Sequence, residues 1–117
     1  MALLDLETGA LIEGGAEPAT VLEPTADASA LAAASSADGV VGIRFPSFGD
    51  GRGISLAVLL RERHGFKGEL RAVGYLIPDL APFLWRSGFD TAEITDANDV
   101  DTWKSSLQRI KHSYQPG

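Results

Sequence analysis

The chain has 117 residues, a formal net charge of −6 and no cysteine. This length fits one domain, and the lack of cysteine excludes disulfides, thiolate nucleophiles, cysteine-ligated zinc and iron–sulfur clusters. The acidic balance disfavours binding to nucleic acid or to anionic membranes, and no apolar run reaches the ~20 residues of a membrane-spanning helix. We therefore expect a single cytoplasmic domain over residues 1–117, with no metal site and no cofactor.

The first 39 residues form an acidic N-terminal region in which no Lys or Arg occurs. Residues 3–6 predict a short strand, and residues 11–12 return beside it after a turn at 8–9. Residues 13–25 are rich in Gly, Pro and acids, which predicts a loop or a loosely packed arm. Residues 27–34 predict a short helix with Thr25 or Asp27 as its N-cap.

Residues 40–113 predict a strand–helix rhythm that is repeated three times. The expected strands cover 40–45, 70–77 and 91–95, and the expected helices cover 54–64, 79–87 and 99–113. Short connections between such elements indicate an α/β fold with a small, mostly parallel sheet. Both a half-barrel-like arrangement and a small open doubly wound sheet fit this pattern. A small sheet exposes its edges, so we also expect a homodimer.

Polar residues follow each predicted strand, at the edge of a parallel sheet where ligands usually bind. After the first strand, Gly51 and Gly53 allow the backbone to approach a ligand, and Arg52 offers a planar donor fork to an anion. Asp50 could orient Arg52 or act as an acid or base. Asp79 and Asp96 follow the next two strands. The candidate ligand-binding residues are Asp50, Gly51, Arg52, Gly53 and Arg71, and the candidate catalytic residues are Asp50 and Asp79.

A purely structural interpretation competes with this site. Asp50, Asp79 and Asp96 each precede a predicted helix, where Asp is a common N-cap, and the glycines suit a tight turn. The turn also lacks the Lys-Ser/Thr ending of a phosphate loop. Arg61 and Arg63 are expected on a solvated helix face, paired with neighbouring carboxylates. Arg71 begins its strand, which places it toward the opposite end from the turn.

Three segments within residues 40–95 carry the motifs of a known family. They are Phe45-Pro46-x-Phe48-x-Asp50-Gly51-Arg52-Gly53, Arg61-Glu62-Arg63-x-Gly65-Phe66-x-Gly68-Glu69-Leu70-Arg71-Ala72, and Arg86-x-Gly88-Phe89-Asp90. Together they resemble the bacterial domain of unknown function 934 family. Members are often labelled as oxidoreductases of sulfite reduction, a label that rests largely on gene neighbourhood. The resemblance therefore implies a pathway, and it marks Asp50, Gly51, Arg52, Glu69, Arg71 and Asp90 as the residues of interest.

The chain departs from the family pattern at two positions. Ser87 stands where members often have Cys, and Leu80 follows Asp79 where members often have Gln. Sulfite reduction transfers six electrons through groups such as sirohaem and iron–sulfur clusters. Since the chain has no cysteine and no flavin or nicotinamide fingerprint, we do not expect it to be an autonomous redox enzyme.

These observations leave three hypotheses open. The first is a non-catalytic accessory protein of assimilatory sulfite or sulfate reduction. It would bind a partner, such as sulfite reductase or another sulfur-assimilation enzyme, or a small anion, through the Asp50-Gly51-Arg52 turn. The second is a cofactor-free lyase, isomerase or hydrolase acting on a small anionic substrate, with Asp50 or Asp79 as base and Arg52 or Arg71 holding the anion. The third is a scaffolding domain with no small ligand.

Overall fold

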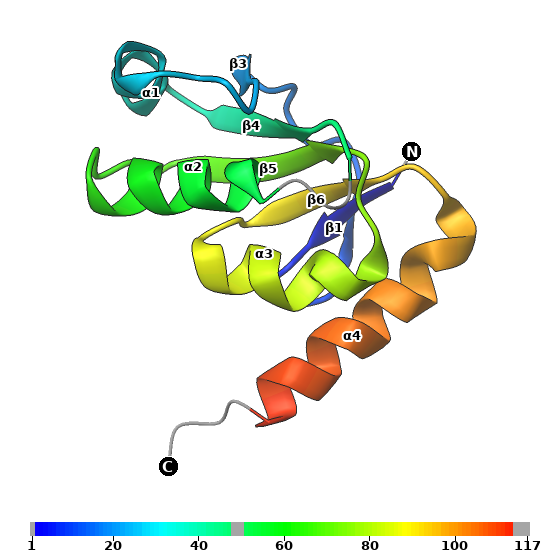
Figure 1. Ribbon diagram of the computed structural model, residues 1–117. Helices are drawn as coiled ribbons and strands as arrows, with labels where there is room; N and C mark the ends of the chain where they lie inside the picture. The colour runs from blue at the N-terminus through cyan, green and yellow to red at the C-terminus, as the bar shows by residue number, and fades with distance from the viewer. Residues whose placement is uncertain (1, 48–50, 114–117) are drawn as a thin grey trace.

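A computed structural model of the chain describes residues 2–47 and 51–113, and Figure 1 shows the arrangement of its elements. In chain order the strands and helices are β1 (Ala2–Asp5), β2 (Leu11–Ile12), β3 (Thr20–Leu22), α1 (Ala28–Ser35), β4 (Val40–Phe45), α2 (Arg52–Glu62), β5 (Glu69–Gly74), the 3₁₀ helix η1 (Pro78–Leu80), α3 (Ala81–Ser87), β6 (Thr91–Ile94), the 3₁₀ helix η2 (Ala97–Asp99) and α4 (Val100–Ser113).

The strands form one six-stranded sheet in the order β2-β1-β6-β5-β4-β3. β3, β4, β5 and β6 are parallel to one another, and β1 and β2 are antiparallel additions beside β6. This arrangement confirms the expected α/β fold and its mostly parallel sheet. It also confirms the hairpin expected at residues 3–12.

All four helices pack on the same face of the sheet. The strand residues of the single hydrophobic core belong to one side of the strands, as with Val41, Ile43 and Phe45 of β4. Ala34 of α1 and Trp103 of α4 join the same core. A doubly wound sheet carries helices on both faces, whereas consecutive parallel strands with helices on one face are typical of a half barrel. The fold is therefore half-barrel-like.

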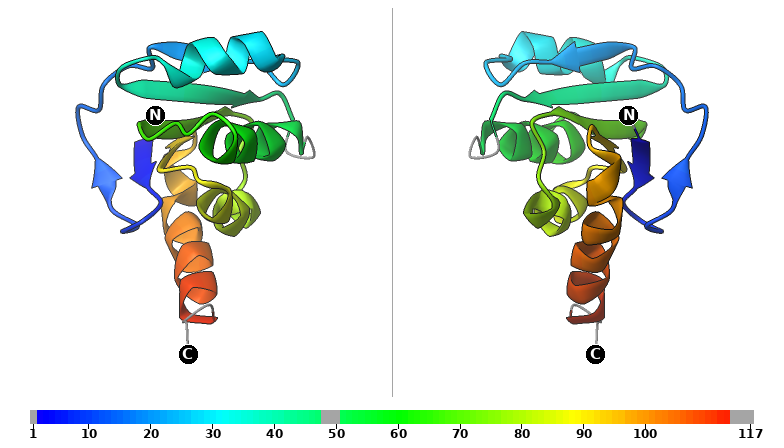
Figure 2. Two further views of the ribbon diagram at one scale, coloured as in Figure 1. Left: turned by 90° about the vertical axis from the view of Figure 1, so that its left-hand side faces the viewer. Right: turned by 90° about the vertical axis from the view of Figure 1, so that its right-hand side faces the viewer.

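The second face of the sheet, which we call the helix-free face, is crossed by residues 13–19, here called the strap (Figure 2). β2 and β3 lie at opposite edges of the sheet, so the strap must pass over the strands between them. The strap bends as it crosses: residues 13, 14 and 19 lie in bends, and Gly14 has a φ of 69°, in the left-handed region.

The expectation of a loop over residues 13–25 was incomplete, because β3 lies inside this stretch. Val21 and Leu22 are its only large aliphatic residues. Their strand is held by parallel pairing with β4, in which Thr20 lies opposite Val41 and Leu22 opposite Ile43. A three-residue strand carries too little periodicity to be recognised locally. With β3 included, the chain holds four consecutive βα units instead of three.

Local signals explain most of the remaining boundaries. Asp27 caps α1, since its Oδ1 accepts from Ala30 N at 2.9 Å. Gly88 ends α3 with φ of 109°, a conformation that side chains disfavour. The strand expected over residues 70–77 ends earlier, at Gly74. Within the described residues, no helix is long and apolar enough to cross a membrane.

Candidate functional site

The connection after β4 leads to the start of α2, at the end of the sheet where the parallel strands β4, β5 and β6 all finish. Arg52 is the first residue of α2 and is exposed, and Gly51 before it is also exposed. Gly53 is buried: a Cβ added there would lie 2.6 Å from Cζ of Phe45. Close helix–strand packing accounts for this glycine without any ligand. Asp50 lies outside the described residues.

The two other predicted aspartates differ in what they do. Asp79 is exposed within η1, whose N-cap is Ile77, and no side-chain hydrogen bond caps η1 or α3. The capping role considered for Asp79 is therefore wrong. Asp96 does cap its turn, because its Oδ1 accepts from Asn98 N at 2.9 Å. The Asp96 side chain is therefore used as a cap, and the Asp79 side chain is not.

Arg71 lies on the helix-free face, separated from Arg52 by the sheet. It is the third residue of β5 and pairs with Gly42 and Thr91 in the two neighbouring strands. Its neighbours Leu70 and Ala72 point into the core, so the alternation of the strand sends Arg71 to the other side. The structure thus places Gly51 and Arg52 at the carboxyl end of the parallel strands and Arg71 apart from them, on the helix-free face.

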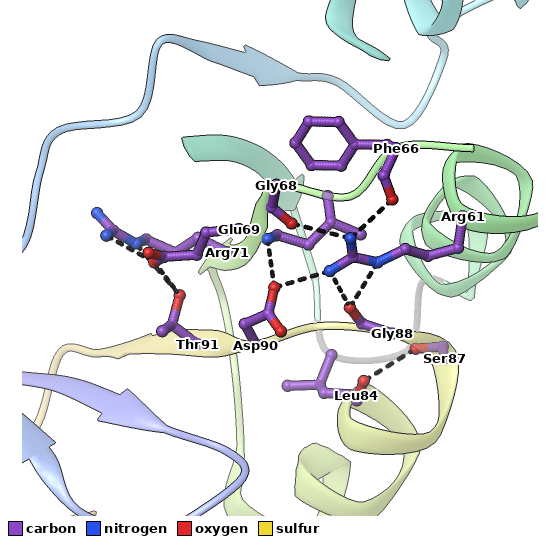
Figure 3. Close-up of polar contacts among 11 residues, drawn as sticks. Arg61, Phe66, Gly68, Glu69, Arg71, Leu84, Ser87, Gly88, Asp90 and Thr91 are labelled. Carbon is purple, nitrogen blue, oxygen red and sulfur yellow. Dashed lines mark hydrogen bonds and ion pairs between the residues drawn. The ribbon is translucent and has the colours of Figure 1, made fainter. Parts of the chain in front are cut away.

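Arg71 is almost fully buried, with 5% of its side chain exposed, and several oxygens satisfy its guanidinium (Figure 3). Nη2 donates to Glu69 Oε2 at 2.9 Å, and Nε donates to Thr91 Oγ1 at 3.3 Å. The Thr91 hydroxyl in turn donates to Glu69 Oε2 at 2.9 Å. Nη1 donates to the carbonyl of Ala16 at 2.8 Å and lies 3.9 Å from Glu93 Oε2. Buried charges need such partners, so Arg71 is an organising group of this face.

Arg71 also fastens the strap to the sheet through Ala16. Two further contacts lie beside this one. A Cβ on Gly15 would come within 2.7 Å of Leu3 Cδ2, and a Cβ on Gly42 would lie 3.7 Å from the ring of Pro18. The strap therefore passes close to the sheet at both positions. A side chain at Gly15 would have to displace Leu3, whereas the distance between Gly42 and Pro18 is an ordinary van der Waals contact.

Two cavities open on the helix-free face, one on each side of the Arg71–Glu69–Thr91 cluster. The first has a volume of about 200 Å³ and is lined by Ala2, Leu3, Ile12, Gly14, Gly15, Glu17, Arg71 and Glu93. The second has a volume of about 370 Å³ and is lined by Asp5, Glu7, Ile12, Lys67, Gly68, Glu69, Asp90 and Thr91. Six carboxylates and only two cationic side chains thus border the two cavities. Both cavities are open and polar, which suits a surface contact better than an enclosed small molecule.

A second polar cluster lies where β5 and β6 begin, and it is centred on Arg61 of α2 (Figure 3). Its guanidinium donates to the carbonyls of Phe66, Gly68 and Gly88 at 2.8–3.1 Å. Nη2 also binds Asp90 Oδ2 at 2.7 Å, and the same oxygen accepts from Leu70 N at 2.9 Å. The solvated helix face expected for Arg61 is therefore wrong. This arginine ties the α2–β5 and α3–β6 connections together.

Ser87 has a local structural role. Its hydroxyl donates to the carbonyl of Phe83 at 2.8 Å, and it lies 3.2 Å from the carbonyl of Leu84. The side chain is largely buried at the end of α3. Within residues 2–47 and 51–113, no group of three or more His, Asp or Glu residues is arranged to hold a metal ion.

The fold and its polar clusters define a class of protein: an α/β domain of four consecutive βα units with one face free of helices. The family model described as "Bacterial protein of unknown function (DUF934)" matches residues 19–117, and the chain belongs to this family. The match begins next to β3, so it spans all four βα units and extends beyond the 40–95 stretch that carries the motifs. No curated protein and no solved structure matches the chain significantly.

Proposed function

We propose that this protein is a non-catalytic accessory protein of assimilatory sulfite or sulfate reduction, acting in the cytoplasm. It binds a small anion or a partner enzyme, such as sulfite reductase, through the turn that contains Gly51 and Arg52. The pathway in this proposal comes from the label that the family resemblance implies. The binding role is supported by the position of Gly51 and Arg52 at the start of α2.

The observation that carries the binding role is the convergence of three connections at one sheet edge. The turn before α2, η1 and η2 all follow parallel strands, and they bring Arg52, Asp79 and Asp96 to this edge. Arg52 stands at the N-terminus of an eleven-residue helix, where backbone N–H groups favour an anion. An exposed arginine at such a position suits sulfite, sulfate or phosphate.

Two other arginines, Arg61 and Arg71, stabilise the fold through contacts of their own. Arg61 is engaged by three carbonyls and Asp90, and Arg71 by Glu69, Thr91 and Ala16. The alternative, a cofactor-free lyase, isomerase or hydrolase, would therefore hold its anionic substrate through Arg52 without help from Arg71.

The homodimer also stays a prediction, and the two edge strands, of two and three residues, offer little backbone for sheet pairing.

A thermal-shift series with sulfite, sulfate and phosphate tests the anion part. A ligand that binds only the folded protein stabilises it by RT ln(1 + [L]/Kd), about 2.7 kcal/mol at one hundred times Kd. We expect one of the three anions to raise the melting temperature of the wild-type chain and of Arg63→Ala, but not that of Arg52→Ala. An equal shift in all three chains would place the anion elsewhere.

A genetic and biochemical pair of experiments tests the pathway. Cells lacking the gene should grow poorly with sulfate or sulfite as sulfur source and normally with cysteine. The tagged chain should retain purified sulfite reductase on a column. Normal growth on sulfate together with no retention would contradict the proposal.

A further inference from the structure

We infer that the strap is a hinged lid on the helix-free face, which opens while the sheet stays folded, and that Arg71 is the side chain that holds it closed. The closed strap is then an autoinhibitory contact, because it keeps other hydrogen-bond acceptors away from one end of a buried guanidinium. This inference does not rest on the proposed function, since it uses none of the residues of the Gly51–Arg52 turn.

The strap is joined to the sheet at few points. Among the described residues, two hydrogen bonds link it to the strands: Arg71 Nη1 donates to the carbonyl of Ala16 at 2.8 Å, and Ala19 N donates to the carbonyl of Val40 at 2.7 Å. The second bond lies at the end of the strap, next to β3. Residues 13–17 are all exposed. The middle of the strap therefore depends on Arg71 for its hydrogen bonding to the sheet.

Both ends of the strap are anchored in the sheet. At one end Ile12 lies opposite Leu3 in the antiparallel pair of β1 and β2, and β1 keeps Leu4 fully buried in the core. At the other end Thr20 lies opposite Val41 in the parallel pair of β3 and β4. A segment that is held at both ends and exposed between them can open by itself, without loss of the core.

The glycines near the start of the strap provide a hinge. Gly14 has a φ of 69°, and Gly15 follows it directly. Two adjacent residues without a Cβ can absorb the change of backbone angles that opening needs. The bends at residues 13, 14 and 19 also leave slack, because a bent segment can lengthen while its ends stay in place.

Opening costs little because Arg71 keeps its other partners. Nη2 donates to Glu69 and Nε donates to Thr91, and neither residue belongs to the strap (Figure 3). When the strap lifts, water replaces the carbonyl of Ala16 as the acceptor for Nη1. The guanidinium is never left without its ion pair, so opening requires much less free energy than global unfolding.

Opening changes access to the cavity of about 200 Å³ beside Arg71. Gly14, Gly15 and Glu17 of the strap line this cavity together with Arg71 and Glu93 of the sheet. Lifting the strap removes the first group from the lining and uncovers Nη1, which is bound to the strap in the closed state. The position of the strap thus controls whether Arg71 can contact a molecule on the helix-free face.

A disulfide can lock the strap closed, and the chain has no other cysteine to compete with it. A Cβ built on Gly42 lies 3.7 Å from Cβ of Pro18, within the range of about 3.5–4.5 Å found in disulfides. The same Cβ lies 3.2 Å from Cγ2 of Val21, which must shift slightly. Pro18→Cys/Gly42→Cys therefore gives one chain that can be compared in its oxidised and reduced forms.

Native digestion of this full-length variant with proteinase K, with cleavages in residues 13–18 timed by mass spectrometry, tests the lid. Proteolysis follows the population of the open form when opening and closing are fast relative to cleavage. We expect the strap to be cut about tenfold more slowly in the oxidised chain than in the reduced chain. Equal rates in the two forms would overturn the inference.

Arg71→Lys tests the role of Arg71 without cysteines. Lysine keeps the positive charge but loses the planar fork that reaches Ala16, so we expect the strap to be cut about fivefold faster than in wild type. Arg44→Lys is the matched control, because Arg44 is an exposed arginine of the neighbouring strand and pairs with Glu23, outside the strap. Its rate should lie within about twofold of wild type.

Two further outcomes would overturn the lid. One is equal strap cleavage in Arg71→Lys and Arg44→Lys. The other is a rate of strap cleavage in the wild-type chain that rises with urea as steeply as global unfolding measured by circular dichroism, because the strap would then open only with the whole fold. A shallow dependence on urea supports a local opening.

Discussion

Arg61 of α2 and Asp90, 29 residues further along the chain, form an ion pair of 2.7 Å at the point where β5 and β6 begin. The same carboxylate oxygen accepts from the backbone of Leu70, so one ion pair fixes a helix and two strands. The guanidinium also lies 5.4 Å from the ring centre of Phe66. This end of the sheet is therefore held by structure-forming contacts.

Replacing Arg61 with lysine keeps the charge but removes the planar fork that reaches three carbonyls and Asp90. We expect the free energy of unfolding to fall by about 2–3 kcal/mol, since hydrogen bonds that involve a charged group contribute about 1.5–3 kcal/mol each. Urea denaturation followed by circular dichroism measures the change. Arg63→Lys, two residues away and exposed, is the control and should stay within about 0.5 kcal/mol of wild type. Equal stability of the two variants would refute the role given to Arg61.

The Arg71 cluster makes a separate prediction through Thr91. Thr91→Val keeps the shape but removes the hydroxyl that accepts from Arg71 and donates to Glu69. The lost bonds are buried, so we expect a destabilisation of about 1–2 kcal/mol. Thr95→Val, at an exposed site just past the end of β6, should change stability by less than about 0.5 kcal/mol in the same urea series. A neutral Thr91→Val would mean that the cluster does not order the helix-free face.

Gly74 and Gly39 form a matched pair because their φ angles are 99° and 101°. A Cβ on Gly74 would lie 2.4 Å from the carbonyl oxygen of Phe45, whereas a Cβ on Gly39 would meet nothing within 4 Å. Gly39→Ala should therefore cost only backbone strain, about 1 kcal/mol, and Gly74→Ala about 2–4 kcal/mol because the end of β4 must also shift. Thermal unfolding of both variants gives the difference. If the two alanine variants melt together, the contact between Gly74 and Phe45 has been overestimated.

The cap of α1 makes the fourth prediction. Asp27→Ala removes the oxygen that accepts from Ala30 N and should destabilise the chain by about 1 kcal/mol. Asp38→Ala, just after α1, removes the same charge without removing a cap. It should therefore be nearly neutral in chemical denaturation. A larger effect at Asp38 than at Asp27 would contradict the capping geometry.

The regular elements could be predicted from the sequence where a local pattern is strong. β4 is a run of β-branched and apolar residues, and α4 repeats apolar residues at helical spacing. The glycines and Asp27 mark where helices stop or start. These signals act within a few residues, so they need no knowledge of the tertiary structure.

The rest depends on contacts between distant parts of the chain. β3 exists through its pairing with β4, and Arg61 meets Asp90 only after the sheet has formed. The sequence did hold one unused signal: Leu70 and Ala72 alternate with Glu69 and Arg71. That alternation could have placed Arg71 on the face away from the core and therefore away from Arg52.

The accessory role is tested most directly by sedimentation velocity of the purified chain mixed with purified sulfite reductase, at about 50 mM and about 300 mM salt. The account predicts a complex at the lower salt that weakens at the higher salt, and that weakens further with Arg52→Ala but not with Arg63→Ala. Two species that sediment independently at the lower salt would contradict it.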